Sequence, residues 1–144
     1  MDIKRVYKGE DIKKLLNQRS PILMVDDFEY VSDEVGVACL TISAENMFCV
    51  DGKFTEPGLI EHIAQSASAF VSYRAIKNEG AENALLGFIG EVKKFKLQSS
   101  LPSVNDMLYT TINIQSVVMN ITMFSAETRV GDRVVATCQM KLSV

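Results

Sequence analysis

Ionisable side chains that can transfer protons gather in residues 52–65, GKFTEPGLIEHIAQ. This stretch contains His62, the only histidine of the chain, directly after Glu61. Carboxylates and imidazoles are common acids and bases in enzymes, so the stretch predicts proton transfer to or from a bound substrate. Packing offers a plainer alternative, in which Glu61 stabilises the first turn of a helix and His62 is a buried or interface residue. The sequence leaves both open.

Helical geometry separates Glu61 from His62. Successive helix residues point roughly 100° apart, so Glu61 and His62 cannot easily reach one substrate atom from the same helix. Gln65 follows Glu61 by one turn and lies on the same face. Glu61 and His62 are therefore separate catalytic candidates, and Gln65 is a neighbour of Glu61.

A long central helix must position these residues, and the sequence predicts it over about 56–77. Thr55 can cap its start, Glu56 and Pro57 suit its first turn, and Gly80 supplies the exit. The middle of this helix, IAQSASAFVSYRAI, carries a single charge, which predicts burial on most sides. Its small residues suit a helix that a curved sheet encloses closely.

Strand-like segments supply that sheet. Residues 22–43 read as two strands joined by a turn near 32–36, with a connection over 47–54 before the helix. A short amphipathic helix is expected at 11–17, and four more strands are predicted at 84–97, 107–117, 121–130 and 134–142. This order predicts an α+β fold in which an antiparallel sheet curls around one helix, as a single domain over residues 1–144.

Composition excludes several classes of function. The 144 residues carry a net charge of -3, so a nucleic-acid partner is not expected. The three cysteines lack a CxxC pair, which argues against a disulfide framework and a metal site. The charged start is unlike a signal peptide, and no stretch approaches the ~20 apolar residues of a membrane span, so we expect a cytoplasmic protein.

Three stretches resemble the hotdog-fold 3-hydroxyacyl-[acyl-carrier-protein] dehydratases. LLNQRSPILMVDDFEYV resembles that family's leucine pair, His-Arg-x-Pro element and Val-Asp run, with Gln18 where histidine is usual. GKF followed by EHIAQ resembles its Gly-His-Phe and Glu-x-x-Ala-Gln motifs. GEVKKFKLQSSLPSVND resembles its strand with a basic-Phe-basic core and the following loop. Together these stretches span most of the chain.

The resemblance implies a hotdog fold and the catalytic roles of that family. Glu61 matches the helix carboxylate and Gln65 the glutamine of Ala-Gln, so the resemblance implies that Glu61 is the principal catalytic residue and that Gln65 binds substrate. The catalytic histidine of Gly-His-Phe falls at Lys53, so this chain is a divergent member. Only seven residues separate Lys53 from Glu61, which shortens the intervening loop. A backbone amide near the helix start, at Gly58 or Leu59, is expected to bind the thioester carbonyl, and Phe54 to contact substrate.

The resemblance also implies partners. The expected substrate is an acyl thioester on acyl carrier protein or CoA, and no cofactor is expected. Lys93, Lys94 and Lys96 form a basic strip that could dock an acidic carrier protein. A homodimer is expected, and a higher oligomer or a heterodimer with an active homologue stays open.

Three functions remain. The first is dehydration of a 3-hydroxyacyl thioester to a trans-2-enoyl thioester in fatty acid or related lipid or polyene biosynthesis. The second is a hotdog thioesterase, in which a helix carboxylate activates water or attacks the thioester. The third is a noncatalytic acyl-binding subunit of an active dehydratase, suggested by lysine in place of the catalytic histidine.

Overall fold

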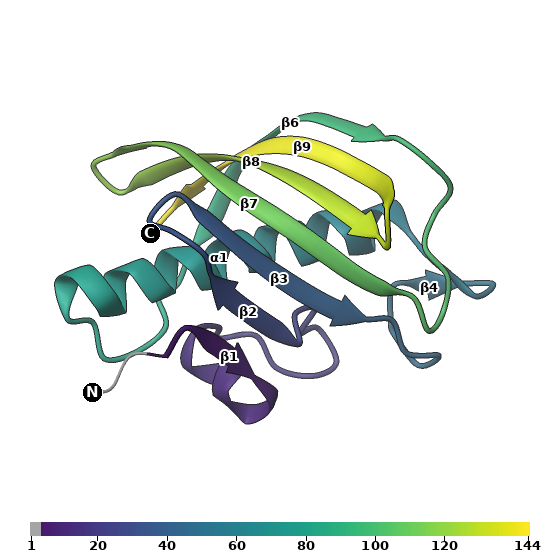
Figure 1. Cartoon of the computed structure of the whole chain (residues 1–144), viewed down its shortest axis with the longest axis horizontal. Coiled ribbons are helices and arrows are strands. Elements are labelled where there is room, and N and C mark those ends of the chain that lie inside the picture. Colours follow the sequence, from purple (N-terminus) through teal and green to yellow (C-terminus); the bar gives the residue numbers. More distant parts are fainter. Residues whose placement is uncertain (1–3) are drawn as a thin grey trace.

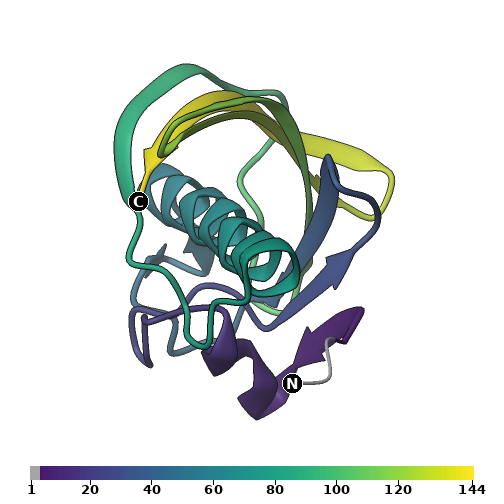
Figure 2. The same ribbon diagram turned by 90° about the vertical axis from the view of Figure 1, so that its left-hand side faces the viewer.

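A seven-stranded antiparallel sheet curves around one long helix in the computed structural model, which describes residues 4–144. Figure 2 looks along the helix and shows the sheet wrapped around it. The spatial order of the strands is β1-β2-β3-β7-β8-β9-β6. Their bounds are β1 Val6–Lys8, β2 Asp27–Tyr30, β3 Val35–Thr41, β6 Phe88–Leu97, β7 Met107–Val118, β8 Ile121–Val130 and β9 Arg133–Ser143. The expected α+β architecture is confirmed (Figure 1).

The central helix, α1, spans Glu56–Glu79. Thr55 occupies the N-cap position in an extended conformation, but its hydroxyl donates to Phe48 O at 2.7 Å and does not cap the helix. Gly80 ends the helix with φ of 70°, a left-handed conformation that glycine adopts without a steric penalty. In the described chain no helix is both long and apolar enough to span a membrane.

Apolar side chains surround α1, so it has no broad solvent-exposed face along its middle. Leu59 and Phe70 are fully buried on one side of the helix, and Ser72, which is also fully buried, lies roughly on the opposite side. Alternate residues of the sheet point inward and meet them, as the period of two in a strand requires. The core therefore lies between α1 and the concave side of the sheet.

Two predicted elements differ from the structure at the N-terminal side. In place of an α-helix at 11–17, a 3₁₀-helix, η1, spans Gly9–Lys14. Its Ile12 is buried as predicted, as are Leu15 and Leu16 just after it. The first predicted strand, from residue 22, begins only at Asp27, because the Met24 N–H donates to the Gln65 side chain.

The predicted strand at 84–97 also begins later, at Phe88. The Leu85 N–H donates to the Ser72 hydroxyl of α1 at 3.0 Å, which holds this stretch against the helix and away from the sheet. The connection before α1 contains two two-residue strands, β4 (Cys49–Val50) and β5 (Lys53–Phe54), which pair with each other.

Strand β6 forms one edge of the sheet and pairs only with β9. Its ladder has register shifts between Ile89 and Glu91 and between Lys93 and Lys96, and Lys94 has φ of 54°. Large apolar side chains on β6 are exposed, led by Phe88 at 61%. An unpaired edge with exposed apolar side chains is a surface to which another strand can add.

Gly36 of β3 tests how closely α1 approaches the sheet. A Cβ there would lie 2.8 Å from the Phe28 ring and 3.0 Å from Phe70 of α1. We expect Gly36→Ala to lower the free energy of unfolding by about 1–3 kcal/mol through overpacking. Gly90→Ala is the control, because the nearest atom to its Cβ is 3.9 Å away. Urea denaturation of both variants measures the difference, and equal stabilities would contradict the close packing.

Candidate functional site

Glu61 lines a cavity of about 210 Å³ between one face of α1 and the start of β6. Ala64, Gln65 and Ser68 follow Glu61 at spacings of three, four and seven residues and form the helix side of this cavity. Among the described residues that line it, Glu61 is the only ionisable one. The complete lining is Gln18, Glu61, Ala64, Gln65, Ser68, Gly87, Phe88, Ile89 and Leu142.

Gln65 fixes the position of the Glu61 carboxylate. Its amide nitrogen donates to Glu61 Oε1 at 2.8 Å and to Ile22 O at 2.9 Å, and its oxygen accepts from the Met24 N–H at 2.6 Å. A primary amide has two hydrogens, so neither is left for a substrate. Gln65, which is 1% exposed, therefore acts on the site through Glu61.

His62 lies in the core, on another side of α1 from the cavity. Its Nδ1 is 2.7 Å from Met24 O, and its Nε2 is 2.8 Å from the Thr110 hydroxyl of β7. Thr110 in turn lies 2.6 Å from the Thr128 hydroxyl of β8. Both ring nitrogens are thus occupied within the protein, and the ring is fully buried.

The direction of these hydrogen bonds follows from their partners. A carbonyl oxygen only accepts, so Nδ1 carries the proton and donates to Met24 O. In the neutral ring Nε2 then accepts from Thr110, whose oxygen accepts from Thr128. Burial lowers the pKa of His62 to about 4, against a smaller opposing effect of the Met24 hydrogen bond. His62 is neutral at pH 7 and links α1 to two strands.

The remaining candidates near the helix start do not line the Glu61 cavity. Lys53 is exposed, and its ammonium donates to the Ser103 hydroxyl at 2.8 Å. Phe54 is fully buried in the core. A Cβ on Gly58 would lie 2.8 Å from the Phe54 ring, and the Leu59 N–H donates to Thr55 O as the first helical hydrogen bond. Of the predicted site residues, the structure brings only Glu61 and Gln65 together.

Lys93, Lys94 and Lys96 are exposed on β6, as expected for a docking strip. The Lys93 ammonium lies 3.6 Å from the Glu91 carboxylate. The bulge between Lys93 and Lys96 interrupts the alternation of the strand, so all three side chains remain accessible to solvent.

Several cavity residues were missed by sequence reasoning. Gln18 carried a signal, because it replaces a histidine usual in the resembling family. Phe88, Ile89 and Leu142 carried none, because β6 and β9 meet only through the order of strands in the sheet. Reading residues 84–97 as one strand also concealed the close approach of Gly87 to Ser68.

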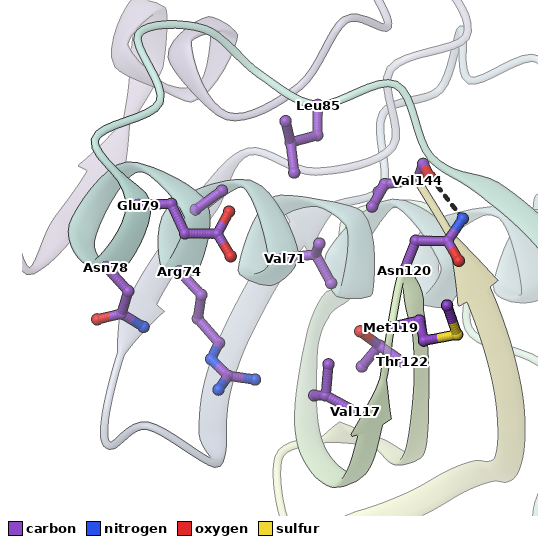
Figure 3. A pocket seen from close by; sticks show the side chains of 11 residues that line it. Val71, Arg74, Asn78, Glu79, Leu85, Val117, Met119, Asn120, Thr122 and Val144 are labelled. Carbon is purple, nitrogen blue, oxygen red and sulfur yellow. Dashed lines mark hydrogen bonds between the residues drawn. The ribbon is translucent and has the colours of Figure 1, made fainter.

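A second cavity, of about 120 Å³, lies towards the C-terminal end of α1 (Figure 3). Arg74 and Glu79 both line it, and the Arg74 Nε is buried without a hydrogen-bond partner among the described residues. Arg74 is 13 residues beyond Glu61, roughly 20 Å along the helix axis. The two cavities therefore do not share one reacting centre.

The buried His62 predicts a pH-dependent stability. Because its folded pKa is below the usual 6.5, the unfolded chain binds the proton first as the pH falls. The free energy of unfolding should therefore fall between pH 6.5 and pH 4, with His62 accounting for about 3 kcal/mol. Above pH 6.5 this contribution is fully present.

Denaturation of the wild type and His62→Gln across this pH range isolates the contribution of the imidazole, because carboxylates titrate in both proteins. The stability difference between them should shrink towards pH 4. A constant difference would contradict the neutral, buried imidazole.

Comparison with known proteins identifies the family. The model of the ApeP-like family, described as ApeP dehydratase, matches residues 10–144. No curated protein gives a significant match. Among solved structures, the chain is similar to the dehydratase heterocomplex ApeI:P from Xenorhabdus doucetiae, with a TM-score of 0.81 and 18% identity over 92% of this chain and 89% of that chain.

Two further structures are similar in fold. An HP0420 homologue from Helicobacter felis has a TM-score of 0.68 and 14% identity over 92% of this chain and 98% of that chain. A hypothetical thioesterase with coenzyme A from Streptococcus pneumoniae TIGR4 has a TM-score of 0.63 and 12% identity over 81% and 83% of the two chains. These likenesses show a shared hotdog fold. Since the family model covers nearly the whole sequence, the chain belongs to the ApeP-like dehydratase family.

Proposed function

We propose that this chain is a subunit of a 3-hydroxyacyl thioester dehydratase in fatty acid or related lipid or polyene biosynthesis. The observation that carries the proposal is the carboxylate of Glu61, which lies half-buried in a cavity and is fixed there by Gln65. Membership of a dehydratase family supports the same class of reaction.

The reaction needs one base and one acid. A base removes the proton on C2, the C2–C3 double bond forms, and the C3 hydroxyl departs as water after it takes up a proton. Gln65 bonds one oxygen of Glu61, so the other oxygen is available to a substrate in the cavity. In this proposal Glu61 protonates the leaving hydroxyl. The reaction is redox-neutral and requires no cofactor.

The second catalytic group is proposed to come from another subunit. The Glu61 cavity lies at the edge of the sheet, where Phe88 and Ile89 of β6 line it and are also exposed to solvent. A subunit that pairs along β6 would cover the cavity and bring its own side chains to Glu61. Lys53 of that subunit is the candidate in a homodimer, and a different residue would serve in a heterodimer with an active homologue.

The proposed substrate arrives as a thioester on acyl carrier protein or CoA. Lys93, Lys94 and Lys96 are exposed on β6, the strand whose start lines the cavity, and suit an acidic carrier protein. Of the two backbone amides expected to bind the thioester carbonyl, that of Leu59 already donates to Thr55 O, and neither residue lines the Glu61 cavity.

A noncatalytic partner subunit is the second candidate function. The observation that favours it is that His62 is buried in the core and Lys53 is bonded to Ser103. Among residues 4–144, Glu61 therefore has no second acid or base in the cavity. The similar structure described as a dehydratase heterocomplex gives a precedent for such pairing.

Turnover of a 3-hydroxyacyl pantetheine thioester tests the dehydratase function. We expect the purified protein to form the enoyl thioester, measured by its ultraviolet absorbance. Glu61→Gln should lower kcat by about 100-fold or more, because it removes a proton-transferring group without changing the size of the side chain. Lys53→Met measures the contribution of the lysine.

The controls separate the three functions. Glu56→Gln makes the same substitution at an exposed residue of α1 outside the cavity and should leave turnover unchanged. Release of free thiol without enoyl absorbance would indicate a thioesterase. No turnover alone, with activity restored or increased when a dehydratase homologue is added, would indicate the noncatalytic subunit. Turnover unaffected by Glu61→Gln would exclude the proposed mechanism.

A further inference from the structure

A cationic cavity of about 430 Å³ lies beside the Glu61 cavity. It is enclosed by η1, the turn that follows it, the C-terminal half of α1 and the irregular segment after α1. Three cationic side chains line it, together with one acidic residue, Glu82. The complete lining is Tyr7, Lys13, Lys14, Asn17, Arg19, Ile76, Glu82, Asn83 and Ala84.

The two cavities share a wall. Asn17 and Arg19 line the cationic cavity, whereas Gln18 between them lines the Glu61 cavity. Across from this turn, Ala84 lines the first cavity and Gly87 the second. A flexible molecule with two functional ends can therefore occupy both cavities by passing over a single turn of chain.

Arg19 is held with part of its guanidinium free. One terminal nitrogen, Nη1, donates to Leu16 O at 2.6 Å and to Gln18 O at 2.9 Å. The remaining N–H groups make no hydrogen bond to any residue within 4–144. A fixed guanidinium with free donors matches the paired oxygens of a phosphate.

The two lysines can turn to a bound anion at little cost. Lys13 pairs with Glu10 at 2.6 Å and Lys14 with the half-buried Asp11 at 3.2 Å. Both lysines are exposed, and such surface pairs contribute little to stability. Residues 4–19 contain six cationic and two acidic side chains, in a chain whose net charge is -3. This local excess of positive charge attracts anions to an otherwise acidic protein.

We propose that the cationic cavity binds the phosphate of a phosphopantetheine arm while the thioester end of the arm lies in the Glu61 cavity. Acyl carrier protein and CoA share this arm, so one phosphate site serves either carrier. Asn17 and Asn83 can hydrogen-bond to the amide groups of pantetheine. The inference rests on the proposed function, because it requires an acyl thioester at Glu61.

Binding of two matched analogues tests the site without turnover. The probes are octanoyl-4′-phosphopantetheine and octanoyl-pantetheine, each with an amide in place of the thioester, so that neither dehydration nor hydrolysis occurs. We expect calorimetry at low salt to show binding of the phosphorylated analogue that is tighter by about tenfold or more, as hydrogen bonds to a charged group imply. Added salt should reduce the difference in affinity between the two analogues.

Variants assign the preference to particular side chains. Arg19→Gln should remove most of the preference for phosphate and leave the affinity for the unphosphorylated analogue unchanged. Lys13→Gln combined with Lys14→Gln should reduce the preference and tests the same site should Arg19→Gln fail to fold. Lys77→Gln combined with Lys141→Gln is the matched control, which removes two lysines that line neither cavity and should keep the preference.

The outcomes distinguish this inference from the proposed function. Equal affinity of the wild type for the two analogues, or binding of neither, would overturn the phosphate site. A preference lost in the control variant and kept in the Arg19 variant would also overturn it. The CoA and carrier-protein forms of the amide analogue should lose affinity equally in Arg19→Gln, and loss with only one form would refute a shared phosphate site. Phosphate-dependent binding without enoyl formation would support the phosphate site and contradict the proposed dehydratase activity.

Discussion

Two polar side chains hold the buried helix at one rotation inside the sheet. Hydrophobic burial is non-directional, so a helix that is apolar on most sides can gain it at many rotations. His62 bonds to Met24 O and Gln65 to Met24 N–H, while His62 also bonds to Thr110 of β7. Rotating α1 would leave these buried groups unpaired, which is costly in the core. The direction in which the Glu61 side chain points depends on these hydrogen bonds.

This arrangement places Glu61 and His62, which are neighbours in the sequence, in different environments. Because consecutive helix residues differ by about 100°, anchoring His62 to the core directs Glu61 towards β6. There the carboxylate meets the edge of the sheet, where Phe88 remains open to solvent. The imidazole serves the fold and the carboxylate faces the cavity. Among the described residues, Glu61 is the single ionisable group of its cavity, which fits a proposed site that a second subunit completes.

Much of the fold followed from local patterns, and the misses have identifiable causes. The span of α1 and the β7–β9 strands were readable from Pro57, Gly80, periodicity and turns, although the Thr55 hydroxyl does not cap the helix. The stretches before β2 and β6 are apolar like strands, but side chains of α1 accept hydrogen bonds from their N–H groups, as Ser72 does from Leu85. Such captures depend on residues distant in sequence. The glycine at residue 9, with φ of 59°, begins η1 as a 3₁₀-helix earlier than the apolar spacing indicated.

The sequence by itself determined the central helix, its small and apolar composition, and the one-turn spacing that places Gln65 beside Glu61. These properties depend on neighbours within a few residues, so local geometry suffices. Only the tertiary structure decided that His62 is buried, that Phe54 belongs to the core, and that Leu142 of β9 joins Phe88 at the cavity. Those outcomes follow from strand order and helix rotation, which long-range packing and hydrogen bonds fix together.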